Sequence, residues 1–290
     1  MKISGFTIIK NAVINDYPVV ESITSILPLV DEMIVLAGDS SDSTRALLES
    51  IKSNKMKIID SIWDPALRTG GQVLAVETDK AFQLVAADSD WAFYIQADEV
   101  LHEKYHLAIK EACLEYKNEQ QVEGLLFNYL HFYGTYDYVG DSRRWYNKEI
   151  RIIRNNKSIR SYKDAQGFRK NGKKLKVKQI DACIYHYGWV KSPLLMKNKL
   201  ERVGALWHSD ETMNMKKREL ELFNFDDFDS LALFPNTHPE VMKPRIKNTN
   251  WSLNIDTSRK RFKWKDRILY YVEKATGKRL FSFKNYKLVK

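Results

Sequence analysis

The feature that most constrains the fold is a regular alternation of β-type and helix-type runs near the start of the chain. Short runs rich in apolar and β-branched residues cover 4–12, 31–38, 56–63 and 90–97. The segments between them place apolar residues at helical spacing, over 16–30, 44–53 and 72–87. Strands and helices that alternate at such short intervals predict a parallel sheet wrapped by helices.

Polar residues collect where these strands end. Ligands of open parallel sheets bind beyond the carboxyl ends of the strands. Four segments meet that condition, namely Asn11, the turn 39–42, the loop 68–71 and the pair Asp98-Glu99. We therefore expect them to converge on one edge of the sheet and to form a binding site there.

The second half of the chain has a different pattern. Longer β-type runs cover 123–138, 147–155 and 158–189, and KNGKK within the last predicts a hairpin turn. The fold class is therefore α/β, with a mostly parallel central sheet flanked by helices, a mixed-strand half, and a helical, basic C-terminal extension. We expect a domain at 1–200, made of halves 1–104 and 105–200, and an extension at 201–290.

The positive charge is concentrated in the C-terminal tail. The chain of 290 residues has a formal net charge of +10, and residues 257–290 hold twelve Lys and Arg against two acids, which is the whole excess. The remainder is close to neutral, which argues against a protein that binds nucleic acid over its whole surface. Cations interleaved with aromatics fit a peripheral membrane contact through 257–290, a nucleic-acid contact, or a solvated helix covering the domain.

Cysteine use and the lack of long apolar runs bear on the compartment. Cys113 and Cys183 are far apart and form no CxxC pair, so neither a thiolate zinc site nor a disulfide framework is expected. No apolar run approaches the length of a transmembrane helix, and the first residues lack the apolar core of a signal peptide. These features favour a cytoplasmic protein, with peripheral contact at the inner membrane face left open.

The stretch WAFYIQADE carries an apolar run straight into two carboxylates, Asp98 and Glu99. Carboxylate oxygens suit Mg²⁺ and Mn²⁺, which often use one or two protein carboxylates together with substrate phosphates. A solvated strand end is the simpler interpretation of such a pair. The metal interpretation gains weight from the other polar segments that converge beside it.

Taken in order, these segments resemble the catalytic domain of glycosyltransferase family 2, which has the GT-A fold. The resemblance covers residues 4–190 and is strongest in GDSSDST (38–44), TGGQVLAVETDKAF (69–82) and YIQADE (94–99). It implies a hexosyltransferase-type enzyme of polysaccharide biosynthesis that takes a sugar from a nucleotide-sugar donor. It also implies a divalent cation, Mn²⁺ or Mg²⁺, on the diphosphate of that donor.

The resemblance assigns binding residues as well. It implies that Asp98 and His186 bind the metal, and that the donor is contacted by Asn11, Asp39, Arg68, Gly71, Gln96 and Asp98. The sequence departs from the family pattern at Gln96, where relatives carry the first acid of a D-x-D motif, and at Ala37, where relatives often carry an acid.

The turn 39–42 has a second interpretation. Asp39, Ser40 and Asp42 suit helix capping as well as donor binding, because all three are residue types that accept backbone hydrogen bonds at a helix start. We expect a donor contact for Asp39 and a cap for Asp42.

Inversion at the anomeric carbon needs a general base that takes the proton of the acceptor hydroxyl. Asp164 and Glu149 are the expected catalytic residues, with Asp137 and Glu99 as further candidates. The resemblance places the base just after an R-x-x-R strand, here 151–154, which favours Asp164. Capping of a turn is the other interpretation of Asp164.

The sequence as a whole therefore predicts an inverting glycosyltransferase acting on a glycan or lipid-linked acceptor. Aromatic-rich 127–138 and 143–149 are the expected acceptor wall, although an ordinary β core would show the same composition. Two other functions stay open. One is nucleic-acid binding through the basic C-terminus, although we expect no nucleic acid as a partner. The other is a catalytically inactive sugar-binding module of the same fold, which the uncharged Gln96 favours.

Overall fold

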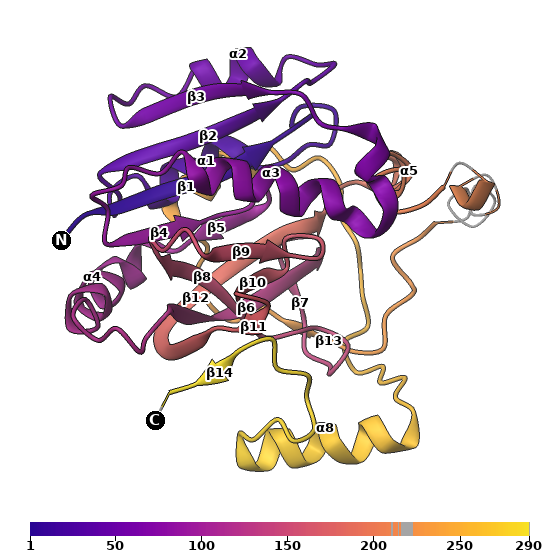
Figure 1. Cartoon of the computed structure of the whole chain (residues 1–290). Coiled ribbons are helices and arrows are strands. Elements are labelled where there is room, and N and C mark those ends of the chain that lie inside the picture. Colours follow the sequence, from indigo (N-terminus) through magenta and orange to yellow (C-terminus); the bar gives the residue numbers. More distant parts are fainter. Residues whose placement is uncertain (210, 214, 216–222, 290) are drawn as a thin grey trace.

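The first part of the chain forms the parallel layer that the sequence predicts (Figure 1). The computed structural model describes residues 1–209, 211–213, 215 and 223–289. The opening elements are β1 (Ile3–Ile9), α1 (Val19–Ile26), β2 (Glu32–Gly38), α2 (Thr44–Glu49), β3 (Met56–Ser61), the 3₁₀ helix η1 (Pro65–Gly71), α3 (Gln72–Gln83) and β4 (Trp91–Tyr94). β1 lies between β2 and β4, β3 pairs with β2, and all four strands are parallel.

A second group of strands extends the same sheet in mixed orientation, as expected. These elements are β5 (Glu99–Leu101), the 3₁₀ helix η2 (Glu103–Tyr105), α4 (His106–Glu115), β6 (Gly124–Gly134), β7 (Tyr138–Gly140), β8 (Lys148–Arg154) and β12 (Lys176–Val190). β8 runs antiparallel to both β4 and β6, so the start of β8 lies beside the end of β4. The long strand β12 lies parallel to β6 and antiparallel to β5.

A small antiparallel sheet covers part of the α3 side. It contains β9 (Ile159–Tyr162), β10 (Gly167–Lys170) and β11 (Lys173–Lys174). The hairpin predicted at KNGKK is confirmed: Asn171 and Gly172, between β10 and β11, have φ values of 49° and 74°. Two successive positive φ values are what a tight hairpin turn of this kind requires.

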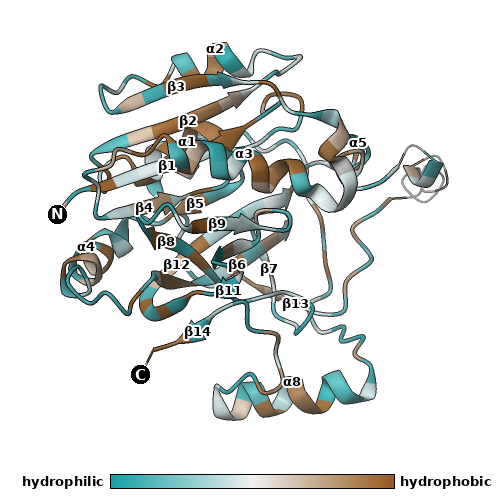
Figure 2. Cartoon of the chain, in the orientation of Figure 1, coloured by the Kyte–Doolittle hydropathy of each residue, from teal (hydrophilic) through white to brown (hydrophobic). Residues whose placement is uncertain are grey.

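The core lies on both faces of the central strands, which explains their nearly continuous apolar sequences. Trp91 and Phe93 of β4 face one cluster together with Ile23 of α1 and Ile109 of α4. Ala92 and Tyr94 face the other cluster, with residues of α3 and β10. Figure 2 shows the brown, apolar colour concentrated along these strands.

Residues 201–290 return to the main sheet at two points. Their described elements are the end of α5 (Pro193–Gly204), β13 (Leu231–Leu233), the 3₁₀ helix η3 (Glu240–Met242), α7 (Lys243–Lys247), α8 (Trp264–Thr276) and β14 (Lys287–Leu288). β13 pairs with β7 and β14 pairs with β12, while α8 lies apart from α1–α3, at the bottom of Figure 1. Across the described residues, none of the helices has the length and apolarity needed to cross a bilayer.

The strand that leads toward Asp98 ends earlier than its sequence predicts. β4 stops at Tyr94, and a turn follows in which the Glu99 N–H donates to the carbonyl oxygen of Gln96 (3.1 Å). Glu99 then opens β5, which pairs with β12 beside His186. The turn separates the two adjacent acids, so that Asp98 and Glu99 have different surroundings.

Candidate active site

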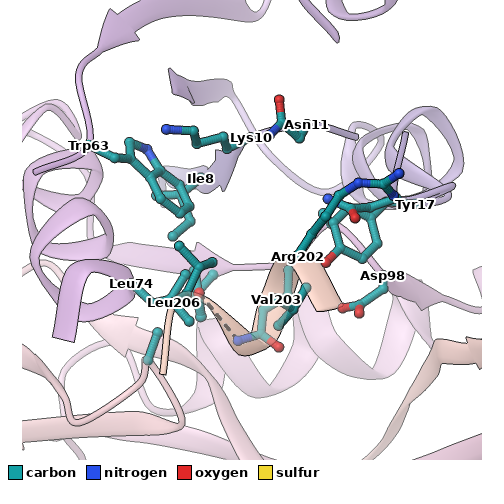
Figure 3. Close-up of a pocket in the computed structure, with 15 residues that line it drawn as sticks. Ile8, Lys10, Asn11, Tyr17, Trp63, Leu74, Asp98, Arg202, Val203 and Leu206 are labelled. Carbon is teal, nitrogen blue, oxygen red and sulfur yellow. Dashed lines mark hydrogen bonds between the residues drawn. The ribbon is translucent and has the colours of Figure 1, made fainter. Parts of the chain in front are cut away.

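A cavity of about 210 Å³ lies at the carboxyl ends of β1 and β4 (Figure 3). Its walls come from the segments after β1, β3 and β4 and from α5, through Ile8, Lys10, Asn11, Asn15, Tyr17, Trp63, Leu74, Tyr94, Gln96, Ala97, Asp98, Ala165, Arg202, Val203 and Leu206. In the view of Figure 3, Trp63 and Lys10 stand on one side, and Tyr17, Arg202 and Asp98 on the other. Of the four segments that we expect to converge at this edge, Asn11 and Asp98 line the cavity, whereas residues of the turn 39–42 line a neighbouring hollow. Gln96, an expected donor contact, lines the cavity as well.

Asp98 is a largely buried carboxylate with charged neighbours, at one end of this cavity. Its Oδ2 lies 3.5 Å from His186 Nε2 and 3.3 Å from Lys199 Nζ, and its side chain is 15% exposed. Burial alone would raise the pKa of this carboxyl, but the charges of His186 and Lys199 outweigh that effect and hold the pKa well below its usual value. Asp98 is therefore a carboxylate throughout the neutral range.

Two lysines that the sequence analysis did not single out lie beside Asp98. Lys199 of α5 also donates to the carbonyl oxygen of Gly188 (2.8 Å), and Lys191 donates to the carbonyl oxygen of Asp16 (2.5 Å). Burial lowers the pKa of both amines, and with the nearby Lys199 it brings the pKa of Lys191 to about 7. Neither amine lines the cavity itself, but both bring positive charge close to Asp98 at its end.

His186 belongs to a short chain of imidazoles. Its Nδ1 lies 3.2 Å from Nδ1 of His131, and Nε2 of His131 lies 2.9 Å from the carbonyl oxygen of Tyr146. Burial and the neighbouring His186 hold the pKa of His131 well below its usual value, so His131 is neutral and positions His186 by hydrogen bonding. The Nε2 of His186 is left facing Asp98, and the expected binding of a metal by this pair stays a prediction.

Glu99 turns away from the cavity into the core. Both of its oxygens accept hydrogen bonds from the guanidinium of Arg151, at 2.8 Å from Nε to Oε2, and Tyr129 donates its hydroxyl to Oε1. Glu99 and Arg151 are 0% and 1% exposed at their side chains. With all its lone pairs directed at these donors, Glu99 is a structural anchor for the turn that carries Asp98, and the base candidates are found elsewhere.

Gln96 lies in the cavity wall and holds the turn in place. Its carbonyl oxygen accepts from the hydroxyl of Ser22 (2.8 Å), and its side-chain amide donates to the hydroxyl of Tyr94 (3.4 Å). Its N–H donates to Glu99 (3.1 Å). The amide therefore occupies the predicted position without adding a second charge beside Asp98.

Asn11 lines the cavity, whereas Asp39 lies in a neighbouring hollow with residues 37–45 and 60–62. Asn11 has φ 53°, and its Oδ1 accepts from the N–H of Ser41 (2.8 Å). Asp39 accepts from Lys10 Nζ (2.7 Å) and from the N–H of Trp63 (3.0 Å). Asp39 thereby ties the end of β1 to the end of β3, next to the cavity.

Asp42 accepts a backbone hydrogen bond at the start of α2, as a capping residue does. Oδ1 of Asp42 accepts from the N–H of Thr44 (3.0 Å), the first residue of α2. Oδ2 of Asp42 accepts from the N–H of Ile14 (2.8 Å), which fixes the loop after β1 against the helix start.

The loop before α3 lies near Asp164. Gly71 has φ 71°, and a Cβ at this position would lie 3.0 Å from Cβ of Asp164 and 3.2 Å from the ring of Trp207. Asp164 itself sits in a strained turn between Lys163 and Ala165, both with positive φ, and burial raises its pKa above the usual value. The side chain of Arg68 lies outside what the structure describes, so its predicted contact with the donor stays a prediction.

Glu149 stands near the start of β8, which places it at the same sheet edge as the end of β4. Its side chain is 9% exposed, and its Oε2 lies 3.8 Å from Nη1 of Arg151. Burial, together with the charges of Glu99 and Asp164, raises the pKa of Glu149 to about 8, against the opposing effect of Arg151. Glu149 and Asp164 are thus close enough to affect each other, and both hold protons unusually tightly.

The surroundings of Asp98 and His186 test whether a divalent cation fits. A methyl group built at Gly188 would lie 2.5 Å from Oδ2 of Asp98 and 2.6 Å from Nε2 of His186, so the missing side chain leaves the approach to both atoms open. The described residues contain no cluster of three or more His, Cys, Asp or Glu side chains that could hold a metal by themselves. The pair Asp98–His186 therefore fits an ion whose remaining ligands are substrate phosphates and water.

The open space at Gly188 leads to a prediction. Gly188→Ala should weaken Mn²⁺ binding by about 10–100-fold, because the added methyl displaces Asp98 and His186 from each other. Manganese electron paramagnetic resonance measures the free ion directly. Gly204→Ala is the matched control, since its methyl meets only the flexible end of Met213. Equal Mn²⁺ affinity in the two variants would show that the ion, if bound, lies elsewhere.

Comparisons with known proteins identify similar folds without identifying a family. No family model and no curated protein matches the sequence. Similar solved structures include S. aureus TarS 1–349 with UDP, at 14% identity and a TM-score of 0.40, with 76% of this chain and 71% of that chain covered. The same protein with UDP-GlcNAc gives 13%, 0.41, 76% and 72%. Glucosyl-3-phosphoglycerate synthase from Mycobacterium tuberculosis, with Mn²⁺, UDP and phosphoglyceric acid, gives 18%, 0.31, 45% and 43%. With every one of these TM-scores below 0.5, the function has to rest on the geometry of the chain itself.

Proposed function

We propose that this protein is a metal-assisted glycosyltransferase that uses a nucleotide-sugar donor. The observation that carries the proposal is the composition of the cavity at the carboxyl edge of the sheet. Asp98 lines one end of the cavity and forms a candidate ion site with His186 beside it. Lys10 and Arg202 line the same space, and Lys199 contacts Asp98. A divalent cation together with a diphosphate matches both features, because the carboxylate binds the cation and the side-chain cations bind the phosphate oxygens.

The two ends of the cavity suit the two ends of the donor. The nucleoside is assigned to the side of Trp63, whose ring offers an aromatic face, with Lys10 beside it in Figure 3. Asn11, above the space between the two sides, is the hydrogen-bonding side chain assigned to it. The diphosphate is assigned to the side of Asp98 and Arg202. A bound Mn²⁺ or Mg²⁺ would act there as a Lewis acid that stabilises the negative charge of the leaving nucleoside diphosphate.

The protein's own residues prepare the transfer itself. The acceptor oxygen forms a bond to the anomeric carbon while the bond from that carbon to the diphosphate oxygen breaks, and the electron pair leaves with the nucleoside diphosphate. The acceptor proton goes to a carboxylate, for which Glu149 and Asp164 are the candidates at this edge of the sheet. A base on the side opposite to the leaving group corresponds to inversion at the anomeric carbon.

The pKa of Glu149 gives a pH prediction. A general base works only when ionised, and a pKa of about 8 leaves few ionised molecules below that pH. The specificity constant kcat/KM should therefore rise about tenfold per pH unit up to that pKa and then level off. Glu149→Gln should remove this limb and lower the rate by about 10²–10⁴-fold. A wild-type profile without a limb near that pH, or one that survives in Glu149→Gln, would transfer the proposal to Asp164.

Donor binding is tested most simply by thermal shift with a set of nucleotide-sugars, each with and without Mn²⁺. A donor that binds only the folded state stabilises it by about 2.7 kcal/mol at a concentration of 100 Kd. We expect one nucleotide to stand out and its effect to require the ion. No shift with any of them would refute the proposal.

A catalytically inactive sugar-binding module is the second candidate, and one observation favours it. Lys199 occupies Oδ2 of Asp98, and Gln96 stands where a second acid would strengthen an ion site. Such a module would bind sugars without Mn²⁺ and would not hydrolyse a donor. The same thermal shifts, followed by a donor hydrolysis assay, separate the two functions.

We further propose that residues 257–290 contact the inner face of an anionic membrane. Trp264, Ile268 and Tyr271 of α8 are 70%, 55% and 58% exposed and recur at helical spacing on one face. The opposite face packs on the body through Tyr270, which donates to Asp141 (2.7 Å). Basic residues surround the exposed row, which suits an interfacial helix on anionic lipid.

Vesicle sedimentation measures this contact. Wild-type protein should bind phosphatidylglycerol-containing vesicles and not pure phosphatidylcholine, and the double variant Trp264→Ser/Ile268→Ser should bind about tenfold more weakly or worse. Leu107→Ser is the control, because Leu107 is 67% exposed on α4, outside the tail. Loss of binding in the control as well, or no binding by the wild type, would refute the membrane contact.

A further inference from the structure

A second cavity, of about 450 Å³, has Glu149 in its wall. It lies where the segment before β8 meets the β9–β10 turn, α8 and the strand-like return of the tail. It is lined by Arg143, Arg144, Tyr146, Asn147, Lys148, Glu149, Gln166, Asp266, Leu269, Arg279, Phe281, Ser282, Phe283, Asn285 and Tyr286. Glu149 also lies 3.8 Å from the guanidinium of Arg151. Arg151 in turn binds Glu99, which anchors the turn that carries Asp98.

Two of the four cations in this wall hold the structure together. Arg143 binds Glu273 of α8 (2.9 Å) and the carbonyl oxygen of Leu280. Arg279 donates to the carbonyl oxygens of Trp145 (2.7 Å) and Ser142 (3.3 Å). These bonds fix the tail against the segment before β8, and they make the cavity a built feature of the fold.

The other two cations are less fully used. Within the part of the chain that the structure describes, Arg144 contacts Asp227, at 3.5 Å from its 87% exposed carboxylate and 3.5 Å from its carbonyl oxygen. Lys148 donates to Oε1 of Gln179, and burial together with the positive charge of Lys284 lowers its pKa. A cation that is half-buried beside a second cation gains from an anionic ligand, which would supply the missing opposite charge.

The mouth of the cavity adds an aromatic feature. Phe281 and Phe283 are 90% and 80% exposed, and Phe281 has φ 56°, a conformation that large side chains rarely adopt. Lys174 lies 5.0 Å from the ring centre of Phe283. Such a surface suits a carbohydrate with a negatively charged substituent. Aromatic rings pack against the C–H faces of sugars, and amide side chains form hydrogen bonds with sugar hydroxyls.

We propose that this cavity binds the acceptor, and that the acceptor is a phosphate-bearing carbohydrate. Arg144 and Lys148 bind its phosphate, Phe281 and Phe283 contact its sugar rings, and its reactive hydroxyl meets Glu149. The proposal rests on the proposed sugar transfer and adds the chemical class of the acceptor. The phosphate can belong to a soluble glycan or to a lipid headgroup, and either source presents the same group to Arg144 and Lys148.

The test measures binding to the full chain without donor. Calorimetric titration with glucose 6-phosphate, inorganic phosphate and uncharged glucose should show that the phosphosugar binds at least about tenfold more tightly than glucose. Arg144→Gln/Lys148→Gln should abolish that preference, whereas Lys52→Gln, an exposed lysine on the opposite part of the chain, should keep it. In a second arm, phosphatidylglycerol vesicles replace the sugar, and every protein in this arm also carries Trp264→Ser/Ile268→Ser, which removes the contact expected through α8. Binding in solution supports a soluble acceptor, and binding to vesicles alone, lost in the same double variant, supports a lipid-borne phosphate.

The outcomes against the proposal are separable from failure of the sugar-transfer function. Equal affinity of the wild type for glucose and glucose 6-phosphate, with no vesicle binding that depends on Arg144 and Lys148, would overturn the acceptor assignment. UDP with Mn²⁺ is titrated in parallel. If UDP binds and the phosphosugar does not, the acceptor assignment is wrong and the donor site is supported. If the phosphosugar binds and UDP does not, the acceptor cavity is supported and the donor site is refuted.

Discussion

Replacing Arg151 with methionine should lower the free energy of unfolding by about 3–5 kcal/mol, because it leaves Glu99 buried without its charged partner. Arg151 binds both oxygens of Glu99, and its guanidinium lies 5.6 Å and 5.3 Å from the ring centres of Tyr94 and Tyr129. Loss of the pair also frees the turn that positions Asp98 and removes the neighbour of Glu149, so activity should fall together with stability.

Urea unfolding followed by tryptophan fluorescence measures this loss. Arg45→Met is the matched control: Arg45 pairs with Glu49 and Asp60 at the surface, where an ion pair contributes about 0–1 kcal/mol. If the two variants lost the same small amount, Arg151 would be another surface-like cation and Glu99 would not anchor the turn.

Asp98→Asn should reduce sugar transfer by roughly 10³-fold while the chain still folds. Asparagine keeps the shape of the side chain but removes the charge that His186 and Lys199 face at 3.5 Å and 3.3 Å. Neither a divalent cation nor the leaving diphosphate would then be held at the end of the cavity. Lys199 would also lose its carboxylate partner, so we expect a moderate loss of stability besides.

The assay for Asp98→Asn is donor turnover, with circular dichroism to confirm the fold. Asp88→Asn is the control, since the side chain of Asp88 is 74% exposed and forms a surface ion pair with Lys2. Transfer that persists in Asp98→Asn at a tenth of the wild-type rate or more would mean that another group stabilises the diphosphate.

The parallel layer could be predicted from sequence because its signals are local. The apolar runs of β1, β2 and β4 and the helical spacing of α1 and α3 each lie within one short segment. The hairpin at Asn171-Gly172 is local in the same sense. The exact end of β4 could not be predicted, because the turn after Tyr94 depends on contacts from distant parts of the chain: Ser22 of α1 donates to Gln96, and Arg151 of β8 holds Glu99.

The candidate site was predictable in part for a similar reason. Asp98 follows one predicted strand and His186 lies within another, and in the structure Oδ2 of Asp98 lies 3.5 Å from Nε2 of His186. Lys199 gives no such signal, since it is one of two lysines on an amphipathic helix and only the packing of α5 distinguishes it from Lys197. Glu99 was a base candidate by type alone, and its burial against Arg151 depends on a contact across 52 positions of the chain.

The most direct measurement is a crystal grown with UDP and Mn²⁺ and examined at the manganese absorption edge. We predict an anomalous peak about 2.0–2.2 Å from Oδ2 of Asp98 and Nε2 of His186, bridged to the diphosphate, with Lys199 moved from the carboxylate to a phosphate oxygen. A diphosphate bound without a peak at Asp98, with Lys199 still at its 3.3 Å contact, would contradict metal-assisted transfer at this site.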